Sequence, residues 1–422
     1  MTKQTRGLQF PLILLAVLPA TGWATNGYFS HGSSIAEKGL AGAGAAYSQD
    51  ALSAATNPAG MVWQGDRWDL GAALFAPSRQ YTVTGAPTGP GSLAPGSVES
   101  ENEMFIIPQY GRNWMLGKKN SIGISIYGNG GMNTEYKAGS GPGTFGGGTA
   151  GVDLSQLFVA TTFAQKMSDS ASWGVSGIIA YQRFEATGLS NFGGFSTDST
   201  KLTNNGTDTS TGIGIRLGVQ GEVSPGVTLG ASYQPKIDMS EFDSYAGLFA
   251  EKGDFDIPST LTVGFAWHIS KSRVFLVDVQ KINYSDVKSV SNSASLLGTS
   301  CPGNGCLGGS NGAGFGWEDM TVVKLGYEWS NDDQWTWRLG FSQTDQPIPN
   351  REVNFNILAP GVIEQHVTFG FTRALSSQSD FNFALMIAPS SSVSGPNAND
   401  STQTIELEMD QYEIAASYSK RF

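Results

Sequence analysis

The chain has 422 residues, of which 14% are charged, and its formal net charge is −11. Ordinary soluble domains are about 25% charged, and nucleic-acid-binding proteins present basic surfaces to phosphates, so the composition argues against both classes. The 55 glycines, the 11% aromatic content and the mean hydropathy of −0.15 also argue against a bundle of membrane-spanning helices.

The first 24 residues are organised like an export signal. Lys3 and Arg6 precede an apolar run from Leu8 to Leu18, and small residues flank a cleavage position after Ala24. The run is too short for a membrane anchor, which needs about 20 apolar residues. We therefore interpret residues 1–24 as a signal peptide for Sec-type export.

The segment 25–66 is rich in Ala, Gly and Ser and shows no strand alternation. A short helix is expected from Gln49 to Ala55, with Ser48 as its cap. It should end near Asn57, because Pro58 disfavours helical geometry in the residue before it. The segment is too short to fold alone, so it needs a larger structure around it.

From residue 67 onward, apolar residues alternate with small or polar ones, which is the period of a β-strand. In 213–223, Ile213, Ile215 and Leu217 share one face, and Arg216 lies among glycines on the other. An apolar outer face and a polar inner face are typical of an outer-membrane barrel. Strands are expected at 67–84, 103–116, 121–136, 152–166, 171–187, 209–223, 227–238, 257–269, 272–284, 318–330, 335–345, 363–374, 379–389 and 409–422.

Short and long connections alternate between these strands, as periplasmic turns and extracellular loops do in outer-membrane barrels. The sequence therefore predicts an all-β fold, a 14-stranded antiparallel transmembrane β-barrel over 67–422. Such a barrel is too wide to be filled by its own side chains. The segment 25–66 is expected to lie inside it as a small helical hatch. The tight turns are 117–120, 167–170, 224–226, 269–272, 330–334 and 376–379.

The last strand alternates up to a terminal aromatic residue, Phe422. This ending resembles the signal by which outer-membrane barrels reach the barrel-assembly machinery, which is therefore an expected partner. Outer-membrane lipid and lipopolysaccharide are the other expected surroundings, and the chain is expected to be a monomer.

The two cysteines, Cys301 and Cys306, lie in the Gly-rich sequence CPGNGCLGG of one long loop. A zinc site would need further ligands, so a disulfide in an oxidising compartment is the preferred interpretation. His31, His268 and His366 are scattered, and no serine lies in a nucleophile motif. We expect no enzyme activity, no cofactor and no metal site.

At residues 38–61, KGLAGAGAAYSQDALSAATNPAGM, the sequence resembles the FadL family of outer-membrane transporters for hydrophobic compounds. The resemblance continues at 255–269 (FDIPSTLTVGFAWHI), 282–287 (INYSDV) and 337–349 (WRLGFSQTDQPIP). It implies passive uptake, with long-chain fatty acids as the first expectation and aromatic or aliphatic hydrocarbons as the second. A general porin for polar solutes is the alternative class.

The resemblance also implies a route. A ligand would land among the extracellular loops and move to an apolar interior pocket. Movement of the mature N-terminus, at Thr25 and Asn26, would then release it sideways through a kink in the third strand. Asn57, Pro58 and Ala59 are expected to support this gate.

The third strand contains the glycine cluster Gly128, Gly130 and Gly131, and its neighbour contains Pro108. Proline lacks an amide donor, and glycine in a strand often marks a bulge. We therefore expect deficient pairing at one place in the wall, which would be the lateral opening. The alternative is that the glycines only lead the strand into its loop.

Several candidates for ligand contact follow from the face of the strand on which a residue lies, or from its place in a long loop. Inward basic side chains could bind a carboxylate, or could instead form salt bridges with Glu222 and Glu328. Inward phenylalanines could contact a ligand tail or pack the hatch. Apolar side chains of the loop 239–253 are expected to form an exposed landing groove. The basic residues are Arg216, Lys324 and Arg338, the inward phenylalanines are Phe75 and Phe158, and the loop residues are Phe242, Tyr245, Leu248 and Phe249.

Overall fold

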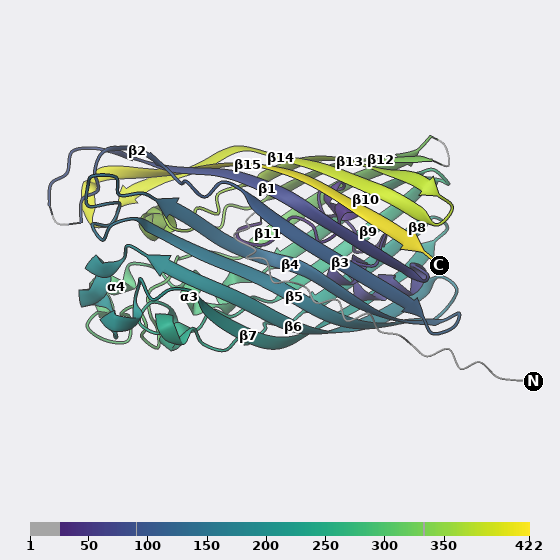
Figure 1. Cartoon of the computed structure of the whole chain (residues 1–422), viewed down its shortest axis with the longest axis horizontal. Helices are drawn as coiled ribbons and strands as arrows, with labels where there is room; N and C mark the ends of the chain where they lie inside the picture. Colours follow the sequence, from purple (N-terminus) through teal and green to yellow (C-terminus); the bar gives the residue numbers. More distant parts are fainter. Residues whose placement is uncertain (1–25, 90, 332–333) are drawn as a thin grey trace, which may run out of the picture.

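The computed structural model describes residues 26–89, 91–331 and 334–422, and its strands close into an antiparallel barrel (Figure 1). The strands pair in chain order from β1 to β15, and β15 pairs back with β1. β2 lies outside this ring and pairs with β1 alone among the described pairings, so the expected fourteen-stranded barrel is confirmed. The predicted signal peptide and Thr25 lie outside the described residues.

The wall strands are β1 (Arg67–Thr84), β3 (Phe105–Met115), β4 (Asn120–Tyr136), β5 (Ala150–Lys166), β6 (Ala171–Thr187), β7 (Asp208–Ser224), β8 (Val227–Gln234), β9 (Thr260–Ser270), β10 (Arg273–Ile282), β11 (Met320–Ser330), β12 (Trp335–Thr344), β13 (Gln365–Ser376), β14 (Ser379–Asn397) and β15 (Asp400–Arg421). The side strand β2 is Gly96–Glu99. The helices are α1 (Ile35–Lys38), α2 (Ala250–Gly253), α3 (Lys288–Ser291), α4 (Leu296–Ser300) and α5 (Val353–Asn356). The 3₁₀ turns are η1 (Ser53–Ala55), η2 (Pro58–Trp63), η3 (Ser190–Phe195), η4 (Ser199–Lys201), η5 (Asp243–Tyr245), η6 (Tyr284–Asp286) and η7 (Asn350–Glu352).

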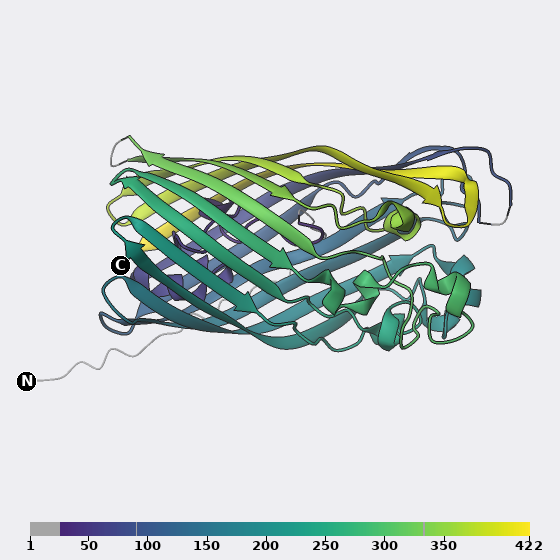
Figure 2. The ribbon, with the colours of Figure 1, turned by 180° about the vertical axis from the view of Figure 1, so that it is seen from behind.

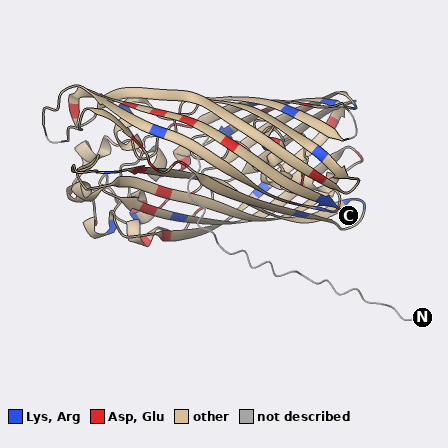
Figure 3. Cartoon of the chain, turned by 45° about the horizontal axis from the view of Figure 1, so that its top comes forward, with Lys and Arg blue, Asp and Glu red and all other residues tan. Residues whose placement is uncertain are grey.

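The wall turns its apolar face outward, as the alternation predicts. Ile213 is 82% exposed, and Ile215 and Leu217 on the same strand are also exposed, whereas Arg216 between them is buried in the lumen. Figure 3 shows the charged residues scattered sparsely along the strands. No helix among the described residues is both long enough and apolar enough to cross a membrane.

The two ends of the barrel differ. Tight turns and the C-terminus lie at one end, and the long loops with α3 and α4 lie at the other (Figures 1 and 2). The N-terminal hatch lies inside the lumen, toward the end with the tight turns (Figure 2). Aromatic and aliphatic side chains of the long loops fill the other half of the lumen.

The prediction of a long loop at 390–408 is wrong. β14 and β15 continue through this region as a hairpin, in which Asn397 faces Asp400. Ile405, Leu407 and Met409 are buried toward the lumen, and the outward positions between them are polar. The strand period therefore persists, but the outer face no longer carries the apolar residues that a lipid-facing strand requires.

The predicted helix from Gln49 to Ala55 is also wrong, because only the 3₁₀ turn η1 forms there. The Ser53 hydroxyl accepts hydrogen bonds from the amides of Gln49 and Asp50, and the Ala51 amide donates to Asp69 of β1 at 2.9 Å. These amides are thus engaged by a side chain or by the wall. Asn57 is extended before Pro58, and its side chain accepts from the Ala59 amide and caps η2.

Inward glycines let the hatch backbone approach the wall. A Cβ atom on Gly174 of β6 would lie 2.5 Å from the Pro58 carbonyl carbon, and one on Gly230 of β8 would lie 2.0 Å from the Ala45 oxygen. On Gly340 of β12 it would lie 2.3 Å from the Ala41 nitrogen. The glycine-rich inner face seen in the sequence is therefore the space that the hatch backbone occupies.

Buried polar side chains of the wall hold the hatch. The Lys38 ammonium donates to both carboxylate oxygens of Glu413 at 2.7 Å, and the amides of Gly44 and Ala45 donate to Asp278 at 2.9 Å. A buried donor without a partner costs about 1–3 kcal/mol, so these contacts favour the docked hatch over a displaced one.

The fit between hatch and wall can be tested with two substitutions on one strand. Gly174→Val should displace the hatch, because overpacking costs about 1–3 kcal/mol and the nearest atoms are backbone. Gly177→Val is the matched control, because no atom lies within 4 Å of its added Cβ. Ion conductance of the purified channel in planar bilayers should rise for the first variant only. Equal conductance of the two variants would contradict the glycine argument.

Candidate functional site

The wall is interrupted between β3 and β4. Their pairing extends only from Tyr110 opposite Ile126 to Met115 opposite Ser121. Closer to the end of the barrel with the long loops, residues 105–109 of β3 pair with β1 but not with β4. On the β4 side, the register with β5 shifts between Gly128 and Gly130, which leaves an extra residue as in a β-bulge. The stretch without β3–β4 pairing is called the wall gap below.

The hatch covers the wall gap from inside. Phe29 forms an antiparallel bridge with Gly130. The Gly131 amide donates to the Tyr28 carbonyl at 2.8 Å, and the Ser30 amide donates to the Asn129 carbonyl at 3.0 Å. The segment 28–30 therefore pairs with β4 in place of the missing strand.

The β3 side of the gap also contacts the hatch. The Gln109 side-chain amide, oriented so that both of its polar atoms are satisfied, donates to the Ser33 carbonyl at 2.9 Å and accepts from the Ile35 amide at 3.3 Å. Pro108, next to Gln109, has no amide hydrogen and so adds no unpaired donor to this edge. The hatch thus bridges both edges, and the interruption lies where Pro108 and the glycine cluster predicted it.

An inner cavity with about 20 Å³ of free space lies between the hatch and the long loops. Phe75 and Arg79 of β1, Met132 and Asn133 of β4, and Met409 of β15 contribute to its lining. Gly27 of the hatch, Trp317 and residues 359–361 complete it. Met132 and Asn133 follow the bulge directly, so the inner cavity adjoins the wall gap.

An outer cavity with about 50 Å³ of free space lies among the long loops. Its walls are almost entirely apolar, and Leu248 and Phe249 are among them. The expectation of an exposed landing groove is wrong, because Phe242, Tyr245 and Phe249 are buried. Phe249 and Phe242 pack against Phe184, with ring centroids 4.6 and 5.6 Å from it, so the loop folds into the barrel mouth. The full lining is Phe145, Val152, Phe184, Leu189, Phe192, Leu248, Phe249, Ser289, Leu307, Ala313, Gly314, Phe315, Phe355 and Leu358.

One loop segment separates the two cavities. Leu358 lines the outer cavity, and Ala359, the next residue, lines the inner one. The Thr134 hydroxyl of β4 donates to the Leu358 carbonyl at 2.8 Å and holds this partition against the wall. Residues 358–361 therefore lie between the two cavities.

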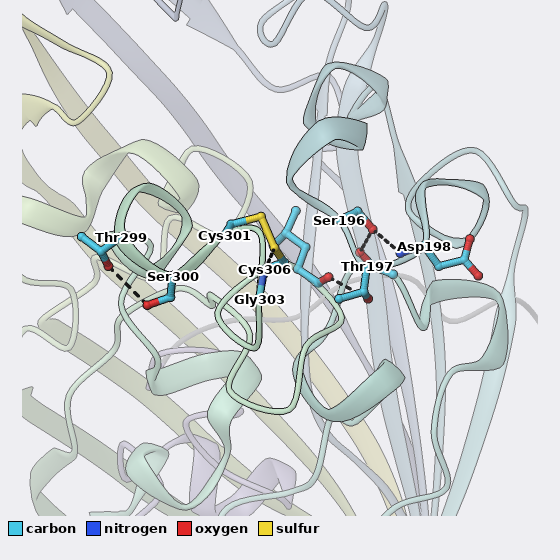
Figure 4. The surroundings of a disulfide bond; sticks show 10 residues. Ser196, Thr197, Asp198, Thr299, Ser300, Cys301, Gly303 and Cys306 are labelled. Atoms are coloured by element: carbon cyan, nitrogen blue, oxygen red, sulfur yellow. Dashed lines mark hydrogen bonds between the residues drawn. A yellow bond between two sulfur atoms is a disulfide. The ribbon is translucent and has the colours of Figure 1, made fainter.

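The predicted disulfide is present, with Cys301 and Cys306 bonded (Figure 4). Leu307, which follows Cys306, lines the outer cavity. Its amide donates to the Phe195 carbonyl at 3.0 Å, and its carbonyl accepts from the Thr197 amide at 2.9 Å. The disulfide loop therefore closes the outer cavity against the neighbouring loop.

The three predicted basic residues lie beside the hatch and line neither described cavity. Arg216 donates to the Ala55 carbonyl, and Lys324 donates to the carbonyls of His31 and Gly42 at 3.4 Å. Arg338 donates to Glu328 at 2.8 Å, which is one of the salt bridges considered as the alternative. The other one is not formed, because Glu222 accepts from the Gly226 amide in a tight turn.

Two further sets of predicted residues support the hatch region. Phe158 is fully buried and packs against Tyr127, with the ring centroids 5.7 Å apart. The Asn57 side chain donates to the carbonyls of Ala45 and Val219, which ties the hatch to β7. These contacts agree with a supporting role for the Asn57–Ala59 segment, which stays a prediction.

Sequence reasoning missed Arg79. It is 5% exposed, lines the inner cavity and lies 5.6 Å from the centre of the Phe105 ring. Its inward parity, shared with Phe75 on β1, was the available signal. That parity alone does not separate a basic residue that faces a cavity from one that contacts the hatch.

The histidines do not form a catalytic arrangement. His31 of the hatch stacks on His366 of β13 with the ring centroids 5.7 Å apart, and both are buried. Ser342 lies 2.9 Å from His366 Nδ1, but His366 is fully buried. His268 lies near a tight turn beside Tyr47.

The contact between hatch and wall gap can be tested at Gly130. A Cβ atom there would lie 2.1 Å from the Tyr28 oxygen, so Gly130→Val should break the pairing of residues 28–30 with β4. The Ser30 and Gly131 amides would lose their acceptors, so their exchange should become about tenfold or more faster in hydrogen–deuterium exchange. Gly177→Val should leave it unchanged. Unaltered exchange in the Gly130 variant would show that β4 does not hold the hatch.

The fold is similar to those of solved structures of known proteins. The Pseudomonas putida toluene transporter TodX has 17% sequence identity and a TM-score of 0.66, over 93% of this chain and 99% of that one. The Ralstonia pickettii toluene transporter TbuX has 19% identity and a TM-score of 0.63, over 93% and 99%. A Pseudomonas aeruginosa FadL homologue has 14% identity and a TM-score of 0.67, over 94% and 100%.

No curated protein sequence matches the chain significantly. The sequence model described as outer membrane protein transport protein (OMPP1/FadL/TodX) matches residues 17–422, which is nearly the whole chain. The chain therefore belongs to the OMPP1/FadL/TodX family of outer membrane transport proteins, which are channels for hydrophobic compounds and not enzymes.

Proposed function

We propose that this channel takes up small hydrophobic compounds of the size of one substituted aromatic ring and releases them sideways through the wall gap. Solved structures of similar fold include the toluene transporters TodX and TbuX and the monoaromatic hydrocarbon channel CymD. Aromatic compounds are therefore placed first, ahead of the long-chain fatty acids that the family resemblance implied.

The observation that carries the proposal is a gap in the wall that hatch residues cover and that an apolar cavity adjoins. Unpaired backbone cannot face the hydrocarbon of a bilayer, so a permanent opening is excluded there. A segment that pairs with β4 through two hydrogen bonds closes the wall at rest and can leave it. Movement of residues 28–30 would connect the inner cavity to lipid.

The proposed route has three steps. A ligand enters the outer cavity beneath the loop that carries the disulfide. It displaces the partition at residues 358–361 and occupies the inner cavity. It then replaces the hatch segment at the wall gap and passes into the membrane, driven by the transfer of its apolar surface out of water.

The solved structures of similar fold, rather than the cavity volume, favour single rings. The free space of the inner cavity is about 20 Å³, which is room for about one water molecule, so a ring must displace residues there. A long-chain fatty acid would have to extend through both cavities and keep the partition open. It remains the second candidate, and the buried Arg79 guanidinium in the inner cavity is the observation that favours an acid.

The basic residues at the hatch have a different proposed role. Because Arg216, Lys324 and Arg338 bond to hatch atoms, we assign them to keeping the hatch docked rather than to binding the ligand.

The hatch and the packed loops also argue against the alternative function of a general porin for polar solutes. Liposome swelling should therefore be slow with sugars, and rapid swelling would contradict the proposed function.

The outer cavity can be filled by Leu248→Trp, since Leu248 is a partly buried lining residue. Toluene uptake by a Gram-negative host that lacks other channels of this kind should then fall by about tenfold at limiting concentration, because burial of one ring contributes roughly 1.5–3 kcal/mol. Phe195→Trp, at a 47% exposed position in a neighbouring loop, is the control and should transport normally. Equal uptake by both variants would remove the outer cavity from the route.

A further inference from the structure

Two basic side chains on the lipid-facing side of the wall converge at the end with the tight turns. The guanidinium carbon of Arg112 on β3 lies 4.5 Å from the centre of the Phe422 ring, and the Lys420 ammonium of β15 lies 5.6 Å from the same centre. The two cations therefore lie within about 10 Å of each other. Trp68 of β1 pairs with Lys420 on one side and with Arg112 on the other. Lys420, Trp68 and Arg112 thus form one row across three neighbouring strands, which is called the basic row below.

Neither cation of the basic row has an ionic partner. Arg112 and Lys420 take part in no ion pair of the described structure, and Arg112 Nη1 has no hydrogen-bond partner there. The acidic side chain that attracts Arg112 is Asp66, whose carboxylate accepts from the Met115 amide at 3.1 Å. The terminal carboxylate of Phe422 is the other acidic group beside the row.

The turn between β3 and β4 adds two further cations to this surface. Lys118 and Lys119 are both exposed in it. The basic row and this turn together carry four basic side chains beside Asp66 and the terminal carboxylate, although the whole chain has a net charge of −11. A local excess of positive charge on an acidic protein attracts anions from outside the chain.

The basic row lies between the wall gap and the tight turns, on the outward face of β3. Ile106, Pro108, Tyr110 and Arg112 alternate along this strand with buried residues, and Ile106 is 62% exposed. Pro108 is four residues from Arg112, which is about 13 Å along an extended strand. One acyl chain spans half of a hydrocarbon core that is about 30 Å thick. A lipid whose head group lies at Arg112 therefore reaches the wall gap with its acyl chain.

We propose that Arg112 and Lys420 bind the phosphate of an anionic phospholipid, and that an acyl chain of this lipid covers the wall gap from the membrane side. The guanidinium and the ammonium supply charge-assisted donors to phosphate oxygens. Trp114, whose ring centre lies 5.0 Å from the Arg112 guanidinium, and Trp68 supply the amphipathic rings that lie at the level of lipid head groups. A zwitterionic lipid carries its own cation beside the phosphate and so gains less from the row.

This proposal goes beyond the proposed function, because it concerns the lipid around the channel and not the transported compound. The hatch covers the wall gap from inside, and the bound lipid covers it from outside. A compound that leaves through the gap then meets an acyl chain directly.

The test compares two lipids with identical acyl chains, dioleoyl phosphatidylglycerol and dioleoyl phosphatidylcholine. Each is titrated into the purified full-length channel in detergent, and the bound lipid is measured by native mass spectrometry. The wild-type channel should bind one phosphatidylglycerol about tenfold or more tightly than phosphatidylcholine, because both basic side chains attract the anionic head group. The double substitution Arg112→Gln with Lys420→Gln should abolish this preference.

Arg373→Gln is the matched control. Arg373 is also exposed at the end with the tight turns and lies 5.3 Å from the centre of the Trp335 ring, but it belongs to β13, which β14, β15 and β1 separate from β3. This variant should keep the preference. Equal binding of the two lipids by the wild-type channel would overturn the proposal, and so would an unchanged preference in the double variant.

The position of the acyl chain needs a second measurement. Phosphatidylglycerol with a photoreactive diazirine in one acyl chain is cross-linked to the channel in nanodiscs, and the labelled peptides are mapped. Labelling of residues 104–110 should exceed that of the outward stretch 367–373 about tenfold in the wild-type channel and should fall to the same level in the double variant. Equal labelling of the two stretches in the wild-type channel would show that this lipid does not cover the wall gap.

The test stays decisive if the double variant does not assemble, since Lys420 lies in the last strand. The lipid preference of the wild-type channel and its loss in Arg112→Gln alone then decide the question. Toluene uptake tests the proposed function separately, because lipid binding is measured without any transported compound.

Discussion

The structure depends on one constraint, which is that backbone amides and carbonyls facing hydrocarbon must be hydrogen-bonded. Where β3 and β4 pair, they satisfy this constraint for each other. At the wall gap, the edge of β3 that would face β4 has no neighbouring strand. There the hatch segment 28–30 supplies the missing partners for β4, and Gln109 of β3 reaches the hatch at Ser33 and Ile35. The hatch is thus part of the wall as well as a plug.

This double role explains how the hatch is held. Its backbone lies against inward glycines, and its free amides bond to buried carboxylates such as Asp278 and Asp69. The segment at the gap is held in two ways: it pairs with β4 through backbone hydrogen bonds, and Tyr28 packs against Tyr284 and Trp317. Under the proposed route, this segment moves while the rest of the hatch stays in place.

The same arrangement separates two kinds of basic side chain. Arg216, Lys324 and Arg338 point into the part of the lumen that the hatch fills, and their donors bond to hatch atoms or to neighbouring side chains. Arg79 lies above the hatch, where the lumen is apolar and partly empty. A basic residue that faces the hatch is therefore a structural contact, whereas one that faces the inner cavity is a candidate ligand contact.

The sequence by itself determined the barrel, its strand count and the place of its break. Strand alternation reports which face meets lipid, and Pro108 and the glycines at 128–131 report deficient pairing locally. It did not determine the helical state of 49–55 or the length of the last hairpin, which depend on contacts with Asp69 and on where the membrane ends. Only the tertiary structure decided that the hatch covers the gap, that Phe249 faces a cavity instead of solvent, and that Arg79 has free donors. Strand alternation marks every lumen-facing residue in the same way. Whether such a residue contacts the hatch or a cavity depends on how far the hatch extends along the barrel.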